Sequence, residues 1–114
     1  MLNQIVLVGR LVRDISINKT EKGKNVANLT LAIPRSFKNY DGVYDTDFID
    51  CTLWDQVASN TASYCKKGDI VGVKGRIESR SYEDKEGNKK YKTEIIAEKV
   101  TFLSNKTKED KADE

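Results

Sequence analysis

Alternating apolar and polar side chains predict a half-buried β-strand over residues 45–54, which read DTDFIDCTLW. Successive side chains of a strand point to opposite faces of the sheet. One face is therefore apolar and carries Ile49, Cys51 and Leu53. The other face combines two aromatic rings with polar neighbours: Phe48, Asp50, Thr52 and Trp54. Two rings thus stand on the face where water is expected, which raises the question of what they contact.

Two strands are predicted before this segment. Residues 3–13 carry apolar side chains on both faces, so we expect the first strand to be buried on both. Gly9 would allow a bend at its centre. Residues 25–33 place leucine and isoleucine on one face and polar side chains on the other. Pro34 is expected to end regular pairing of this second strand, because proline has no backbone N–H to donate.

Helical periodicity occurs once, in residues 55–68, where apolar and small side chains recur at helical spacing: Val57, Ala58, Thr61, Ala62 and Cys65. Gly68 is expected to stop this helix. Two more strands are predicted after it, over residues 69–82 and 90–103, and a charged hairpin joins them. The predicted order is therefore three strands, one helix and two strands.

This order predicts an all-β fold with one helix. It suits a five-stranded Greek-key barrel of the oligonucleotide/oligosaccharide-binding (OB) type, with the helix between strands three and four. An SH3-like barrel would lack the helix, and a ferredoxin-like sandwich would need a second one. The 114 residues suffice for one domain. We place it at residues 1–103 and expect a disordered charged tail over residues 104–114.

Net charge alone does not identify a partner. The chain has 20 basic and 18 acidic residues, and its net charge of +2 is too small to argue for nucleic acid. The predicted tail, SNKTKEDKADE, holds three of the basic and four of the acidic residues. The predicted domain therefore carries 17 basic against 14 acidic residues, so the basic excess lies entirely within it.

The absence of histidine removes several classes of enzyme, because zinc sites that use imidazole and Ser-His or Cys-His nucleophiles cannot be built. Cys51 and Cys65 have no cluster of partnering ligands and are expected to be buried thiols. We therefore expect no catalytic residue, no metal site and no cofactor. The sequence shows no export signal and no run of membrane-spanning length. We expect a protein of the reducing cytoplasm with no membrane partner.

Aromatic rings and cations recur on the surface that an OB barrel uses for its ligand, the outer faces of strands two to four. The rings are Phe37, Phe48, Trp54 and Tyr82. The cations on or beside this surface are Arg10, Arg35, Lys38, Lys74, Arg76 and Arg80. Rings stack on bases at about 1 to 3 kcal/mol per base, and cations hold phosphates. Any one of these side chains could be ordinary surface, but their coincidence favours a groove for single-stranded nucleic acid.

Five segments resemble the bacterial single-stranded DNA-binding protein family, in the form found in low-GC Gram-positive bacteria and their phages. They are MLNQIVLVGRL, VANLTLAIPRSF, DFIDCTLW, KKGDIVGVKGRI and SRSYEDKEGNKKY, spread over residues 1–103. The resemblance implies binding of single-stranded DNA with little sequence preference during replication, recombination and repair. It implies a homotetramer that works at the nucleoid, and it implies that four rings stack on bases: Phe37, Phe48, Trp54 and Tyr82.

Two features depart from the family pattern. Many relatives place a basic residue just after the last ring of strand three, where this chain has Asp55 and Gln56. Relatives also end in an acidic tip that closes on a proline and an aromatic residue, whereas this chain ends in KADE. Replication and repair proteins are therefore candidate partners, but the tip through which relatives recruit them is absent.

Three other functions fit parts of the pattern. Single-stranded RNA, or a primosomal role, would suit the same groove. A nuclease would need carboxylates that converge on a metal ion, but Asp45 and Asp47 are predicted to face inward while Asp50 faces the groove. A secreted carbohydrate-binding barrel would need an export signal, which the sequence does not show.

Overall fold

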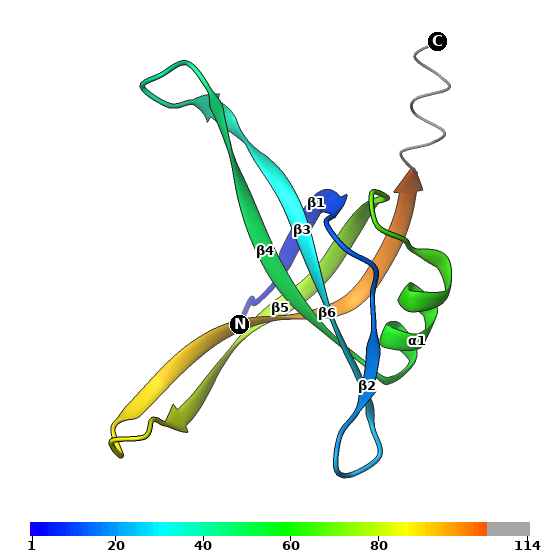
Figure 1. The fold of residues 1–114 in the computed structure, drawn as a ribbon, viewed down its shortest axis with the longest axis vertical. Coiled ribbons are helices and arrows are strands. Elements are labelled where there is room, and N and C mark those ends of the chain that lie inside the picture. Colours follow the sequence, from blue (N-terminus) through cyan, green and yellow to red (C-terminus); the bar gives the residue numbers. More distant parts are fainter. Residues whose placement is uncertain (105–114) are drawn as a thin grey trace.

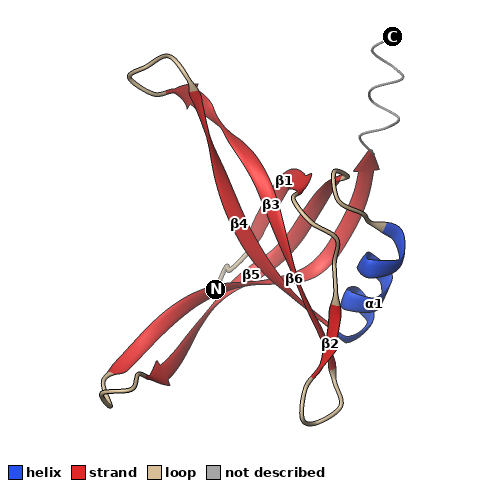
Figure 2. Cartoon of the chain, in the orientation of Figure 1, coloured by secondary structure: helices blue, strands red, loops and turns tan. Residues whose placement is uncertain are grey.

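The computed structural model describes residues 1–104, which form strands and a single helix (Figures 1 and 2). In chain order the elements are β1 (Ile5–Leu11), β2 (Ile17–Lys19), β3 (Asn25–Lys38), β4 (Tyr44–Trp54), α1 (Asp55–Tyr64), β5 (Ile70–Glu83) and β6 (Lys89–Ser104). The predicted all-β fold with one helix is confirmed. Ser104 ends β6, and the rest of the predicted tail lies outside the described residues.

The five long strands close into a barrel. The strand order is β1-β5-β6-β4-β3-β2, and β1 pairs with β3 as well as with β5. The row of strands therefore returns on itself, which is the closure of an OB-type barrel. Two hairpins, β3–β4 and β5–β6, continue beyond the barrel as long arms (Figure 1). The helix α1 lies at the side of the barrel, close to β2 and β6 (Figure 2).

The sequence pattern does not predict β2, a three-residue strand that pairs with the start of β3. All three of its residues are exposed, so no apolar alternation marks it. This extra strand changes the numbering: the helix lies between β4 and β5, not between strands three and four. Its place in the chain, directly after DFIDCTLW, is the predicted one.

The strand β3 continues past Pro34, so the prediction that regular pairing ends there is only partly right. The ladder with β4 includes Pro34 opposite Thr46, then shifts register and resumes with Lys38 opposite Tyr44. The shift follows from the missing N–H of Pro34, which removes one ladder hydrogen bond without ending the strand. The irregular stretch lies in the β3–β4 arm, where it is solvated on both faces.

One face of β1 is exposed, so the prediction that this strand is buried on both faces is wrong for the single chain. Leu11 is buried and Leu7 is partly buried against the barrel core. Val6 and Val8 point the other way and are 67% and 53% exposed. Alternate side chains of a barrel strand face inward and outward, and within the described residues no element covers the outward side of β1.

The helix is shorter than predicted because it ends at Tyr64 and not at Gly68. Cys65 already has extended backbone angles, although its N–H still donates to the Thr61 carbonyl at 2.9 Å. Gly68 instead adopts a positive φ of 94° in the turn that leads into β5. At the other end of the helix, Asp55 has a φ of 49°, a left-handed conformation that few residues other than glycine adopt.

The barrel core consists of the inward side chains of all five long strands, with Ala58 from α1. As predicted, Leu29 and Leu31 of β3 and Cys51 and Leu53 of β4 are buried. The strand β5 enters the core through alternate buried residues, and its register against β6 shifts between Lys74 and Gly75. At this bulge the Gly75 backbone lies against the backbone carbonyl group of Ile96. The close approach leaves no room for a side chain at position 75.

Candidate nucleic-acid interface

A groove crosses the outer face of β3 and β4 and reaches the base of the β5–β6 arm. Its volume is about 760 Å³. The aromatic rings of Phe48 and Trp54 lie in its wall, six residues apart on β4. At about 3.4 Å per residue, their backbone positions are roughly 20 Å apart. The groove is thus long enough to hold more than one base between two rings.

The register of β3 against β4 explains why no side chain of β3 covers the two rings of this groove. Phe48 lies opposite Ala32 and Trp54 lies opposite Val26. Neither neighbour is large enough to cover a ring, and Phe48 is accordingly 65% exposed. Both rings thus line the outer face of β4, Phe48 as an exposed side chain and Trp54 as a half-buried one. Trp54 is also the N-cap residue of α1, so the start of the helix holds its backbone in place.

Three cations lie in the groove, of which the sequence pattern predicts only Arg80. The other two are Arg13 and Lys92. The sequence pattern includes Arg13 in the predicted strand over residues 3–13, but β1 ends at Leu11 and Arg13 lies in the loop that follows. Lys92 could have been found from the β5–β6 hairpin, because its turn sets Arg80 opposite Lys92 and opposite residues of a hairpin share a face.

A chain of hydrogen bonds spans the centre of the groove. Arg13 Nη2 donates to the Thr30 hydroxyl at 3.2 Å, and that hydroxyl donates to Asp50 Oδ1. Thr30 is 7% exposed, so a buried residue supplies the hydroxyl that joins the exposed cation to the exposed carboxylate. Arg13 and Asp50 are therefore held in fixed positions on the groove floor before any ligand binds.

Several predicted residues lie outside this groove. Phe37 and Tyr82 are 64% and 51% exposed, but they belong to the two arms and do not line it. Lys38 also belongs to an arm, where its Nζ lies 5.7 Å from the centre of the Tyr44 ring. Lys74 lies opposite Val6, on the outward face of β1 and β5. The predicted rings are therefore spread over the barrel and both arms.

Arg10 of β1 lies on the same face of the sheet as Phe48, although β1 and β4 are not paired with each other. It is opposite Ala32 in the β1–β3 ladder, and Ala32 is opposite Phe48 in the next ladder. Residues that lie directly opposite each other share a face of the sheet. Arg10, Ala32 and Phe48 thus form one row across three strands, which places this predicted cation on the same face as a predicted ring.

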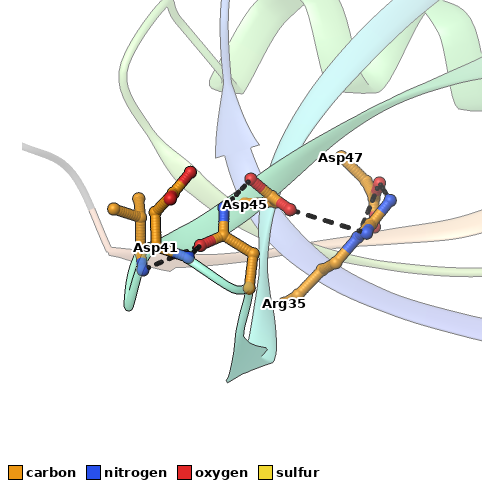
Figure 3. Close-up of polar contacts among 6 residues, drawn as sticks. Arg35, Asp41, Asp45 and Asp47 are labelled. Carbon is orange, nitrogen blue, oxygen red and sulfur yellow. Dashed lines mark hydrogen bonds and ion pairs between the residues drawn. The ribbon is translucent and has the colours of Figure 1, made fainter.

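Carboxylates of the chain itself neutralise Arg35. Its guanidinium group holds Asp47 with Nη2 to Oδ1 at 2.9 Å and Nε to both oxygens at 3.2 Å (Figure 3). Asp45 lies 3.8 Å away and accepts a hydrogen bond from Asn39. The hydrogen bond from Arg35 lowers the pKa of Asp47, and the same contact raises the pKa of Arg35. A phosphate would have to compete with these carboxylates for Arg35.

Arg76 and Arg80, two more of the predicted arginines, are also paired. Arg76 Nε lies 2.7 Å from Glu78, and its Nη1 lies 3.4 Å from Glu98. Arg80 Nη2 lies 3.4 Å from Glu94. Exposed ion pairs of this kind contribute little to stability, so a strong anionic ligand can replace the carboxylate. The carboxylates nevertheless lower the positive potential around these arginines until a ligand replaces them.

A second hollow adjoins the groove at Trp54. Its volume is about 500 Å³, and it lies between Trp54 and the loop that connects β2 to β3. Lys22 and Lys24 of this loop line it, and neither forms an ion pair with another described residue. The sequence pattern assigns these lysines to a basic loop but not to the site. Trp54 therefore has a hollow on each side, and the second one is lined by two lysines and two acidic residues, Glu21 and Asp55.

The described residues offer little for catalysis. They contain no group of three or more acidic or cysteine side chains placed to hold a metal ion. Burial raises the pKa of the Cys51 thiol to about 11 and also raises the pKa of the Cys65 thiol. Neither thiol is therefore ionised at neutral pH. Within residues 1–104 the helix is too short and too polar to cross a membrane.

The fold and the ringed groove define a barrel of the OB class, and comparison with known proteins identifies the family. The model of the Single-strand binding protein family matches residues 2–103. The chain therefore belongs to this family, as its five resembling segments predict.

Three relatives illustrate the match. The chain is 50% identical to "Single-stranded DNA-binding protein B" of Bacillus subtilis, over 99% of this chain and 100% of that protein. It is 50% identical to "Single-stranded DNA-binding protein" of Halalkalibacterium halodurans, over 90% and 61%. It is 47% identical to "Single-stranded DNA-binding protein 3" of Listeria innocua, over 93% and 66%. The chain thus spans all of the first relative and less than two thirds of the other two, and the predicted low-GC Gram-positive type is confirmed.

Proposed function

We propose that this protein binds single-stranded DNA with little sequence preference and protects it during replication, recombination and repair. The observation that carries the proposal is a groove lined by two aromatic rings, the exposed Phe48 and the half-buried Trp54, together with three cations. The names of its relatives support the choice of ligand. The family consists of binding proteins, and we infer that this chain has no catalytic residue, metal or cofactor.

Binding would combine stacking with phosphate contacts. Every base has a flat face, so Phe48 and Trp54 would stack on bases of any sequence at about 1 to 3 kcal/mol each. Phe37 and Tyr82 would extend the stacking surface along the arms. The cations nearest the groove rings are Arg10, Arg13, Arg80 and Lys92, and these would hold phosphates. Lys38, Arg35 and Arg76 would meet the strand farther along its path, the two arginines after releasing their carboxylates. Lys74 lies opposite Val6 and would contact DNA only at the edge of the interface proposed below.

Titration of the wild-type protein with poly-dT tests the proposal. Trp54 is the only tryptophan, so we expect DNA to quench most of the intrinsic fluorescence. The association constant should fall with salt, with a log–log slope of about −0.7 for each phosphate neutralised. A wild type whose fluorescence does not respond to DNA would overturn the proposal.

Two controls separate the alternatives. Poly-U should compete less well than poly-dT, whereas equal or stronger competition would favour an RNA ligand. Single-stranded DNA incubated with the protein and Mg²⁺ or Ca²⁺ should remain intact. Progressive cleavage would point instead to a nuclease.

We further propose that the protein assembles as a homotetramer and that the uncovered face of β1 forms one of its interfaces. Val6 and Val8 are exposed there, next to Leu103, which is 51% exposed and lies beside Gly72. Contiguous apolar surface of this kind is typical of an interface between protein chains. A twofold interface would bring the same face of each chain together. The arrangement would leave the groove on β3 and β4 free for DNA.

Replacing Val6 and Val8 together with aspartate should split the assembly, because four carboxylates would face one another across each twofold interface. Light scattering of the wild type should give about 52 kDa, four times the chain mass of 12.9 kDa, and the double variant should give a smaller mass. Val43→Asp is the matched control, since Val43 is 56% exposed but belongs to the β3–β4 arm. A monomeric wild type would refute the assembly.

Two parts of the proposal concern the setting of the protein. A protein that coats single-stranded DNA would act in the cytoplasm, at the nucleoid. Replication and repair proteins would be its further partners. Residues 105–114, the part of the chain where family members would carry the acidic tip that recruits such proteins, lie outside the described residues.

A further inference from the structure

The floor of the groove between the two rings carries hydrogen-bonding side chains and one unpaired carboxylate. Asp50 and Thr52 lie between Phe48 and Trp54 on the outward face of β4, and their β3 neighbours are Thr30 and Asn28. Asp50 is exposed and lines the groove. A base that enters between the rings would therefore meet the Asp50 carboxylate.

This carboxylate is fixed on one oxygen and available on the other. The buried Thr30 hydroxyl donates to Oδ1 and is itself held by Arg13. No residue within 1–104 donates a hydrogen bond to Oδ2. Asp50 also differs from Asp47, Glu78 and Glu94, which each neutralise an arginine, because it forms no ion pair with a described cation. Oδ2 is thus a fixed acceptor without a partner.

A fixed acceptor distinguishes bases by their edges. An ionised carboxylate accepts hydrogen bonds and cannot donate them. Cytosine presents the N4 amino group as a donor, a contact that aspartate and glutamate make in nucleic-acid recognition. Uracil and thymine present O4 at the same place, an acceptor that the carboxylate repels. Unstacked bases of a single strand expose these edges.

We propose that Asp50 is a specificity-determining residue that favours amino-bearing bases, above all cytosine, between the two rings. The inference rests on the proposed function. It also explains how a carboxylate can remain in a groove for a polyanion. An amino base offsets part of the repulsion between Asp50 and the strand by donating to Oδ2, whereas a keto base presents O4 at the same position and offsets none of the repulsion there.

The test compares oligodeoxycytidine with oligodeoxyuridine of equal length, because their bases differ only at the 4-position substituent and the N3 proton. Dissociation constants are measured by Trp54 fluorescence for the wild type and for Asp50→Asn. Asparagine keeps the shape and can still accept from Thr30, but its amide can face O4 as a donor. We expect the preference for cytosine over uracil to fall by about fivefold in the variant.

Asp55→Asn is the matched control. It removes the same charge one residue beyond Trp54, and asparagine tolerates the left-handed backbone of Asp55. It should change both affinities by the same factor. An Asp50→Asn ratio equal to that of the wild type would overturn the inference while leaving single-strand binding intact. Failure of the wild type to bind either oligonucleotide would instead overturn the proposed function, and the inference with it.

Discussion

Replacing Gly75 with alanine is expected to destabilise the protein by about 3 kcal/mol or more. A Cβ built at this position would lie 2.1 Å from the Ile96 carbonyl oxygen and 3.0 Å from its carbon. Both atoms belong to the backbone of the neighbouring strand, so no side-chain rotation can relieve the clash. The bulge between Lys74 and Gly75 would have to open, which would disturb the β5–β6 pairing. Since small domains are stable by about 5 to 15 kcal/mol, the loss is a large share.

Thermal unfolding followed by circular dichroism measures this effect, and the midpoint should fall by more than about 10 °C. Gly72→Ala is the matched control on the same strand. Its Cβ would make ordinary contacts, the nearest at 3.7 Å from the Leu103 side chain, so its midpoint should change little. Both variants are compared at one protein concentration, because assembly makes the midpoint depend on concentration. Equal midpoints for the two variants would show that the backbone at Gly75 does not approach the Ile96 carbonyl as closely as described.

Replacing Trp54 with alanine should weaken binding of single-stranded DNA by about 1 to 3 kcal/mol, or roughly fivefold to 150-fold. Trp54 has this weight because it adjoins both the groove and the second hollow, so a strand that passes between them must cross it. The variant has no tryptophan, and its affinity is therefore measured by the anisotropy of a labelled oligonucleotide.

Two further variants make this measurement specific. Trp54→Phe should keep most of the affinity, since a phenyl ring can still stack. Tyr64→Ala removes an aromatic side chain that is 76% exposed at the end of α1 and lines neither hollow, so its affinity should match that of the wild type. A Trp54→Ala protein that binds as tightly as the wild type would show that this ring does not stack on bases.

The order of elements was predictable because each long strand carries its own signal. The alternation in residues 45–54 indicates both the strand and an outward face with two rings, of which the structure exposes Phe48 and leaves Trp54 half-buried. The three residues of β2 are all exposed, so no pattern could reveal them. The uncovered face of β1 could not be predicted either. Apolar side chains such as Val6 and Val8 give the same sequence pattern whether their own barrel or another chain covers them.

The site was only partly predictable because charge in a sequence does not show what it pairs with. Arg35 and Arg76 are among the predicted cations, yet each lies within 4 Å of two carboxylates. The register of the strands decides which carboxylates lie that close, and the sequence does not show it. Arg13 belongs to the predicted first strand, but it enters the groove from the loop that follows β1. Lys92 could have been predicted, because the predicted hairpin turn also determines that Lys92 lies opposite Arg80.

The burial of both native thiols has a practical consequence for fluorescence labelling. Cys51 and Cys65 are 1% and 5% exposed, and a thiol with a raised pKa reacts slowly with maleimide dyes. A single cysteine introduced at Tyr40, which is fully exposed in the β3–β4 arm, would take up the dye selectively without any change to the barrel interior. Energy transfer from such a dye could then follow the arm as a strand of DNA is bound and released.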